Sequence, residues 1–153
     1  MPQEQTPIPV IVCGQFEEIG RIVIAGLQPE YEVVHFALTP EACISEIPTV
    51  LQGQTPTSPS STIGTGNVSR RPVAVILGGG YAETFDRVRD GVEAAFASSG
   101  SSGVLWLRHD GSKPAPPLGP EYAKAIVQRV KGALGELAAE GRLGSGETGV
   151  HWY

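Results

Sequence analysis

The stretch that decides the fold is residues 10–27, "VIVCGQFEEIGRIVIAGL". It begins with a short apolar run that ends at Gly14, a pattern typical of a buried β-strand. Apolar and small residues then recur at helical spacing, at Ile19, Ile22, Val23 and Gly26, which predicts an amphipathic helix. A buried strand that passes directly into an amphipathic helix favours an α/β fold.

The same alternation continues along the chain. Further apolar strands are predicted over residues 31–38, 72–80 and 103–110, and further helices over residues 39–47, 81–100 and 121–141. Strict alternation of buried strands and helices indicates a parallel sheet covered on both faces. We therefore predict a single α/β domain over residues 1–153, doubly wound, with a four-stranded, mainly parallel sheet in the order 2-1-3-4.

Two segments depart from this pattern. Residues 52–71 are rich in Ser, Thr, Pro and Gly and have no apolar period, which predicts a flexible loop or, alternatively, a lid over a ligand crevice. Residues 144–153 are predicted to form a C-terminal tail, which ends in Trp152 and Tyr153.

Composition narrows the classes of partner. The net charge is −5 and the basic residues are scattered, whereas nucleic-acid binders usually show a basic face. No apolar run is long enough to span a bilayer, and "MPQEQTPIP" lacks the basic and apolar regions of a secretory signal. Two cysteines do not make a disulfide framework. We expect a cytoplasmic protein without nucleic-acid or membrane partners.

The fold predicts where a ligand would bind. In open parallel sheets, ligands bind beyond the carboxyl ends of the strands, where the strand order reverses. In the order 2-1-3-4 this point lies between the strands that end at Cys13-Gly14 and at Gly78-Gly79-Gly80. The residues predicted to bind a ligand are Cys13, Gly14, Gly20, Gly78, Gly79, Gly80, Tyr81 and Arg108.

The turn from Gly14 to Arg21 resembles the glycine-rich turn of Rossmann-fold NAD(P)-binding proteins, especially that of extended short-chain dehydrogenases. Gly14 and Gly20 match the first and third glycines of that motif, and Arg21 also matches, but Glu17 stands where the second glycine belongs. The resemblance implies a Rossmann-like or flavodoxin-like domain and a nucleotide ligand. However, a carboxylate at Glu17 would repel a diphosphate, and the second strand lacks the acid that holds the ribose. The alternative is that both glycines serve the packing of the turn.

Other residues suggest chemistry at the same sheet edge. The three glycines at 78–80 favour close approach of an anion to the main chain. His109 is a candidate general base, with Asp110 or Glu17 as its partner. The alternative for Asp110 is a turn at the strand exit, and the alternative to a reactive Cys13 is a small buried hydrophobe. The spacing of the Cys and His residues predicts no metal site, and the sequence identifies no cofactor.

Three classes of function remain open from the sequence. The first is a small-molecule-binding domain without a standard dinucleotide site. The second is a small metabolic enzyme that uses His109, or an NAD(P)-binding protein with a divergent turn. The third is a non-catalytic assembly module. The wide apolar face of residues 121–141, together with Trp152 and Tyr153, also predicts a homodimer, against the alternative that this face covers the core of one chain.

Overall fold

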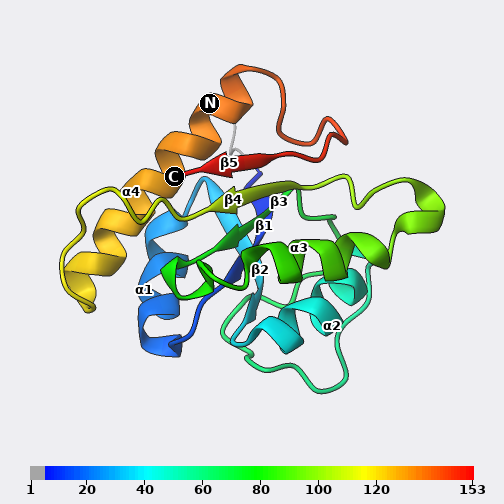
Figure 1. The fold of residues 1–153 in the computed structure, drawn as a ribbon, viewed down its shortest axis with the longest axis horizontal. Helices are drawn as coiled ribbons and strands as arrows, with labels where there is room; N and C mark the ends of the chain where they lie inside the picture. The colour runs from blue at the N-terminus through cyan, green and yellow to red at the C-terminus, as the bar shows by residue number, and fades with distance from the viewer. Residues whose placement is uncertain (1–5) are drawn as a thin grey trace.

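The computed structural model describes residues 6–153. Residues 1–5 lie outside the described residues. They begin the segment "MPQEQTPIP", for which we predicted no secretory signal. The strands are β1 (Ile8–Cys13), β2 (Tyr31–Ala37), β3 (Ala74–Leu77), β4 (Leu105–Arg108) and β5 (Val150–Trp152). The helices are α1 (Glu17–Leu27), α2 (Pro40–Leu51), α3 (Phe85–Ala94) and α4 (Pro120–Ala139), with short 3₁₀ turns at Gly79–Tyr81 and Ala97–Ser99. The predicted α/β alternation is confirmed (Figure 1).

Over residues 6–153 the sheet is parallel throughout and has five strands, in the order β2-β1-β3-β4-β5. The predicted order of the first four strands is confirmed, but the predicted number of strands is one too few. The missing strand comes from the tail, where Val150 pairs with Trp106 and the Trp106 N–H donates to Gly149 O at 2.8 Å. A strand of three residues that follows a glycine-rich segment has no apolar run long enough to be recognised in the sequence.

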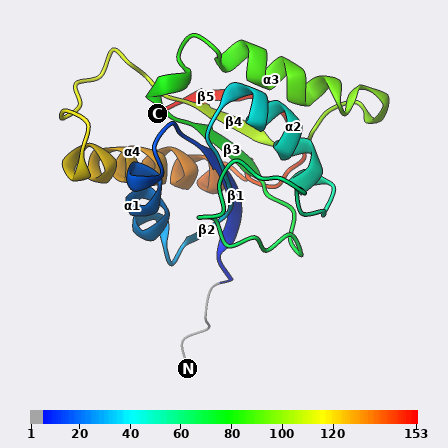
Figure 2. The same cartoon turned by 90° about the horizontal axis from the view of Figure 1, so that it is seen from below.

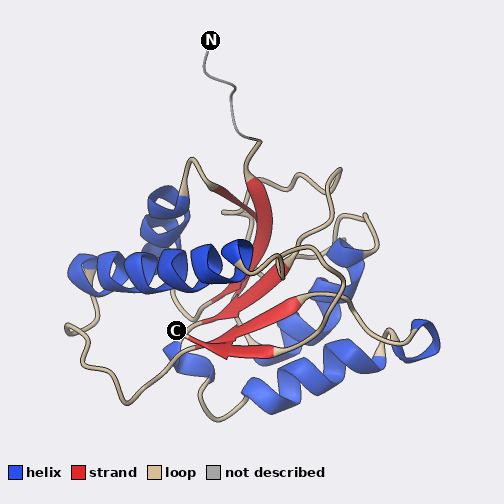
Figure 3. Cartoon of the chain, turned by 90° about the horizontal axis from the view of Figure 1, so that it is seen from above, coloured by secondary structure: helices blue, strands red, loops and turns tan. Residues whose placement is uncertain are grey.

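Two helical layers enclose the sheet, as Figures 2 and 3 show. Helices α1 and α4 pack together on one face, and α2 and α3 pack together on the other. Alternate residues of the central strands therefore feed two cores: Val10 and Val12 face α1 and α4, while Ile11 and Cys13 face α2 and α3. Within residues 6–153, no helix is both long enough and apolar enough to cross a membrane.

The segment over residues 52–71 runs along the outer edge of β2. The N–H groups of Thr65 and Gly66 donate to the main-chain oxygens of Val33 and Val34 at 3.0 and 2.9 Å. Gly64 approaches the strand so closely that a Cβ would lie 2.9 Å from the His35 main-chain nitrogen. The segment thus covers a sheet edge that would otherwise expose unpaired main-chain groups. Its predicted flexibility and its alternative role as a lid stay predictions.

The wide apolar face of α4 is used within the chain. Val127 and Leu134 are both buried in the core, and Val127 packs against Gly26 of α1, where a Cβ would lie 2.8 Å from Val127 Cγ2. Tyr153 is also buried, whereas Trp152 is 56% exposed. The homodimer stays a prediction. Of the residues that suggested it, Trp152 remains exposed, and the structure adds β5 as an edge strand of the sheet.

Light scattering at micromolar concentration tests that prediction. The exposed edge of β5 could pair with the same strand of a second chain about a two-fold axis. The measured mass would then be about twice the 16.1 kDa of one chain. Substitution Trp152→Ala should then weaken the association. A mass near that of one chain would contradict the prediction.

Candidate functional site

A cavity of about 90 Å³ lies beyond the carboxyl ends of β1 and β3. These strands are neighbours in the sheet and end side by side, since Cys13 pairs with Leu77. Their following connections diverge, because β1 leads to α1 on one face and β3 leads to α3 on the other. This is the point of reversed strand order at which open α/β sheets bind ligands.

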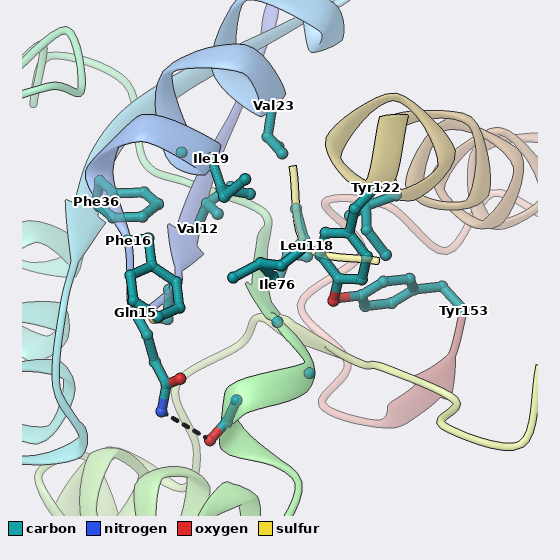
Figure 4. A pocket seen from close by; sticks show the side chains of 17 residues that line it. Val12, Gln15, Phe16, Ile19, Val23, Phe36, Ile76, Leu118, Tyr122 and Tyr153 are labelled. Carbon is teal, nitrogen blue, oxygen red and sulfur yellow. Dashed lines mark hydrogen bonds between the residues drawn. The ribbon is translucent and has the colours of Figure 1, made fainter. Parts of the chain in front are cut away.

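The cavity is lined mainly by apolar and aromatic side chains, as Figure 4 shows. Val12 of β1 and Ile76 of β3 form its floor on the α1/α4 face of the sheet. Helix α1 contributes one wall and helix α4 the other; the wall residues are Ile19, Gly20 and Val23 on α1, and Tyr122 and Ile126 on α4. Phe16 and Leu118, 51% and 61% exposed, stand at the mouth.

Gly14 and Gly20 both make room for the ring of Phe36, which also lines the cavity. A Cβ at Gly20 would lie 2.6 Å from Phe36 Cζ and 3.0 Å from Ile63 Cδ1, and one at Gly14 would lie 3.0 Å from Phe36 Cζ. Phe36 is fully buried near the end of β2, the region where Rossmann-type dinucleotide sites place a ribose-binding acid. The close contact with Phe36 gives both glycines a packing role.

Substitution Gly20→Ala tests this packing role. We expect a loss of about 1–3 kcal/mol in the free energy of unfolding, because overpacking a buried ring outweighs the helix propensity that alanine gains. The matched control is Gly132→Ala on α4, where nothing lies within 4 Å of an added Cβ, and which should gain roughly 0.5–1 kcal/mol. Urea denaturation measures both. If Gly20→Ala and Gly132→Ala stabilise the protein equally, Gly20 does not have the proposed packing role.

The three glycines after β3 also line the cavity. Gly80 O accepts a hydrogen bond from Gln15 Nε2 at 3.2 Å, and a Cβ at Gly80 would collide with that Gln15 side chain at 2.3 Å. A Cβ at Gly79 would lie 3.1 Å from Tyr122 Oη and 3.3 Å from His109 Nδ1. Because Gly79 and Gly80 have no Cβ, the side chains of Gln15, Tyr122 and His109 can approach the main chain closely here.

Tyr153 closes the cavity on the β4 side (Figure 4). Its hydroxyl donates to Leu77 O at 2.6 Å, and its main-chain oxygen accepts hydrogen bonds from Arg129 Nη2 and from the Asp110 N–H, each at 2.8 Å. Burial raises the pKa of the Tyr153 hydroxyl far above its ordinary value. The residue expected to lie in a free tail is therefore a fixed wall of the cavity.

His109 lies behind Tyr153, with the two rings edge to face at a centroid distance of 5.6 Å. Burial of the imidazole, together with the charge of Arg129, holds the pKa of His109 below its ordinary value, although Asp110 acts in the opposite direction. The neutral ring is therefore favoured near neutral pH. Its Nε2 atom is buried and has no hydrogen-bond partner among residues 6–153.

The lowered pKa of His109 predicts a pH dependence of stability. The unfolded chain takes up a proton near pH 6.5, while the folded chain takes it up only at lower pH, so stability is lost as the pH falls from about 6.5 toward the folded pKa. The variant His109→Asn should lose less of its melting temperature between pH 7 and pH 5 than the wild type. Parallel melting curves for the two proteins would contradict this account.

The other two predicted catalytic residues point elsewhere. Asp110 caps a turn: its Oδ1 accepts hydrogen bonds from the N–H and the hydroxyl of Ser112 at 3.0 and 2.6 Å, and these bonds lower the pKa of its carboxyl. Glu17 begins α1, accepts a hydrogen bond from Ser61 Oγ at 3.2 Å and pairs with Arg21 at 3.7 Å. The structure gives His109 no hydrogen bond to either carboxylate within the described chain.

Six of the predicted ligand-binding residues border the cavity: Cys13, Gly14, Gly20, Gly78, Gly79 and Gly80. The other two, Tyr81 and Arg108, lie on the α2/α3 side of the sheet. Tyr81 is buried and its hydroxyl lies 3.2 Å from Gly14 O, which ties the turns after β1 and β3 together. Arg108 lies between the rings of Phe85 and Trp152, 4.7 Å from each centroid.

Cys13 borders the cavity, but its side chain belongs to the core on the opposite face. Burial and the neighbouring Cys43 raise the pKa of the Cys13 thiol well above its ordinary value. A protonated, enclosed thiol is a poor nucleophile, which favours the role of a small buried hydrophobe. In the part of the chain that the structure describes, no group of three or more His, Cys, Asp or Glu side chains is placed to hold a metal ion.

Sequence reasoning missed most of the apolar lining, because residues such as Phe36 and Ile126 have the pattern of ordinary core positions. Helical spacing puts Tyr122 on the apolar face of its helix but gives no sign of a role at the cavity. One signal was present: an aromatic residue, Phe36, near the end of the second strand, where a dinucleotide site would need an acid.

Comparison with known proteins identifies a relative. The chain is 40% identical over 149 residues to a protein of Aspergillus oryzae (strain ATCC 42149 / RIB 40) named "Kojic acid related protein 6". The matched region covers 95% of this chain and 86% of that protein. No family model and no solved structure matches the chain.

Proposed function

The chain belongs to the same family as Kojic acid related protein 6, and we propose that it binds a small, flat and largely apolar molecule in the cavity between α1 and α4. The observation that carries this proposal is an open cavity with aromatic walls at the point where the strand order reverses. Ligand sites in proteins are typically concave and apolar, with a few polar groups that fix orientation.

The dimensions of the cavity favour a single ring. A cavity of about 90 Å³ is smaller than the 150 Å³ engineered cavity that accepts benzene, so a bound ring would extend toward the mouth between Phe16 and Leu118. Both side chains are more than half exposed. An exposed apolar pair at the mouth of an apolar cavity gains buried area when a ligand fills the space between them.

The charges at the same end of the sheet favour a ligand without a diphosphate. Glu17 and Glu18 begin α1 beside the mouth, where a dinucleotide would place its negative charge. The ring of Phe36 fills the space beneath Gly14 and Gly20. An NAD(P) ligand remains the alternative that the turn itself suggests.

Catalysis by His109 has less support from the geometry of the site than binding has, and the non-catalytic assembly module stays an alternative from the sequence. His109 is separated from the cavity by Tyr153 and has no carboxylate partner through a hydrogen bond within the described residues. That arrangement supports binding more than acid–base chemistry.

The cytoplasmic location stays a prediction from the sequence.

A thermal-shift panel tests the proposal. It should contain small aromatic and heteroaromatic compounds, kojic acid because the relative's name mentions it, and NAD(H) and NADP(H). We expect stabilisation by one or more single-ring compounds, and its loss in Val23→Phe, which fills the cavity from α1. The matched control is Ile22→Phe, the neighbouring residue, which lies outside the cavity.

Two results would count against the proposal. Stabilisation by NAD(P) alone would indicate a dinucleotide site. Stabilisation by a single-ring compound that survives Val23→Phe but not Ile22→Phe would place the ligand instead in a separate surface groove, which is lined by Ile22 and Ala25 of α1 and by Lys124 and Gln128 of α4.

A further inference from the structure

We propose that Cys13 and Cys43 are a redox-modification site, at which a peroxide converts the two thiols into a disulfide within the chain. They are the two cysteines of the sequence, and both are free thiols in the structure. The inference is independent of the proposed ligand, because both side chains belong to the core on the opposite face of the sheet from the cavity.

Two elements that are far apart in the sequence bring the cysteines together. Cys13 is the last residue of β1, and Cys43 lies in the first turn of α2. Both are fully buried, at 0% exposure, in the core that α2 and α3 form with the sheet. The two side chains are hydrogen-bonding neighbours there, so their sulfurs lie close together, as the partners of a disulfide must.

The hydroxyl of Tyr81, in the short turn after β3, supports the same arrangement from a third element. The Cys43 thiol donates to Tyr81 Oη at 3.9 Å, and this oxygen lies 3.2 Å from Gly14 O and 3.4 Å from Ala37 O. Both main-chain oxygens belong to neighbours of Cys13, because Gly14 follows it in the chain and Ala37 pairs with it across the sheet. Cys43 is therefore held at the end of β1 by a contact that does not involve the Cys13 sulfur.

The reaction balances with a peroxide as the two-electron oxidant. One cysteine loses its proton, and the thiolate sulfur attacks a peroxide oxygen; the O–O bond breaks, leaving a sulfenic acid and a hydroxide that takes up the released proton. The sulfur of the second thiol then attacks the sulfenic sulfur, the S–O bond breaks, and the departing hydroxide leaves as water with the proton of that thiol. Two thiols are oxidised to one disulfide, and one hydrogen peroxide is reduced to two waters.

Burial selects the oxidant and sets the rate. Hydrogen peroxide is little larger than water, whereas a disulfide of the size of oxidised glutathione cannot reach thiols without exposed surface unless the core opens. Burial and the neighbouring Cys43 also raise the pKa of the Cys13 thiol, so little of its thiolate is present at neutral pH and the reaction is slow. The rate of oxidation should therefore increase as the pH rises.

The test exposes the folded wild-type chain to hydrogen peroxide at mildly alkaline pH. After the peroxide is removed, the chain is unfolded in urea, treated with iodoacetamide and weighed by mass spectrometry without reductant. We expect a monomer that has lost the mass of two hydrogen atoms and takes up no label, and we expect dithiothreitol to restore two labelled thiols. The matched control is Cys43→Ala, in which Cys13 has no partner cysteine and this product should be absent.

The melting temperature shows whether the disulfide fits the native fold. We expect the oxidised chain to melt about 5–10 °C above the reduced one, because the cross-link closes a loop in the unfolded chain, and dithiothreitol should reverse the shift. A lower melting temperature would mean that the bond forms only in a distorted chain, and would overturn the inference. Two labelled thiols left after an exposure that fully oxidises the urea-unfolded chain, or oxygen added to the cysteines without a disulfide, would overturn it as well.

Discussion

Substitution Tyr153→Ala is expected to cost about 3–5 kcal/mol of the free energy of unfolding, the range for truncating a large buried aromatic side chain. Tyr153 is only 2% exposed. Its ring contacts His109 edge to face, and its hydroxyl holds the end of β3 through Leu77 O at 2.6 Å. Removing it would leave a void beside the cavity and free the tail from the sheet.

Two further variants separate the contributions of Tyr153. Tyr153→Phe keeps the ring but leaves Leu77 O without its donor, and should cost about 1–3 kcal/mol. The matched control is Trp152→Ala, which truncates the neighbouring aromatic residue, 56% exposed. Urea denaturation should show a much smaller loss for the control. A loss at Trp152 equal to that at Tyr153 would mean that the tail is held by its surface contact with Arg108 rather than by the core.

Substitution Glu46→Ala is expected to cost a similar amount, about 3–5 kcal/mol, because it leaves the buried His35 ring and the Ser60 N–H without their acceptor, at about 1–3 kcal/mol for each unsatisfied group. Glu46 Oε1 lies 2.7 Å from His35 Nε2, and both side chains are buried. The other carboxylate oxygen accepts a hydrogen bond from the Ser60 N–H at 3.0 Å, and Ser60 Oγ in turn accepts one from the Leu38 N–H at 3.1 Å. Glu46 therefore connects α2, β2 and the segment over residues 52–71.

The same variant should release that segment. Limited proteolysis of Glu46→Ala is expected to cut within residues 52–71 faster than in the wild type, because local opening exposes a segment otherwise held by Ser60. The control is Glu41→Ala on the same helix, which removes an exposed pair with Arg87 at 3.0 Å and should cost at most about 1 kcal/mol. Equal proteolysis of both variants would show that the main-chain bonds to β2 suffice to hold the segment.

The fold was predictable because each element carries its own signal. The apolar strand that ends at Cys13, the cap at Thr39, whose Oγ1 accepts a hydrogen bond from the Ala42 N–H at 3.0 Å, and proline at the first position of α2 are all local features. The strand β5 was not predictable, because its three residues depend on pairing with β4. Pairing of an edge strand is a tertiary effect that a short sequence window does not contain.

The place of the site was predictable, but its character was not. The position of the cavity follows from strand order alone, and the glycines at residues 78–80 border it as expected. Its apolar lining comes from side chains on α1 and α4 that converge only after packing.

The pairing of β1 with β2 has an irregularity that was likewise not predictable from the sequence. Val10 pairs with Val33 and Ile11 with His35, so β2 has one extra residue beside the buried pair of His35 and Glu46.

The most direct test of the central claim is a methyl NMR titration of the wild type with acetophenone. If the cavity between α1 and α4 is the ligand site, the methyl signals of Val12, Ile76 and Ile126, which line it, should shift together with one dissociation constant. Those of Val75 and Val88, in the core on the opposite face of the sheet, should stay in place. Shifts confined to the opposite face, or no shift in the three cavity residues at saturating probe, would contradict the account.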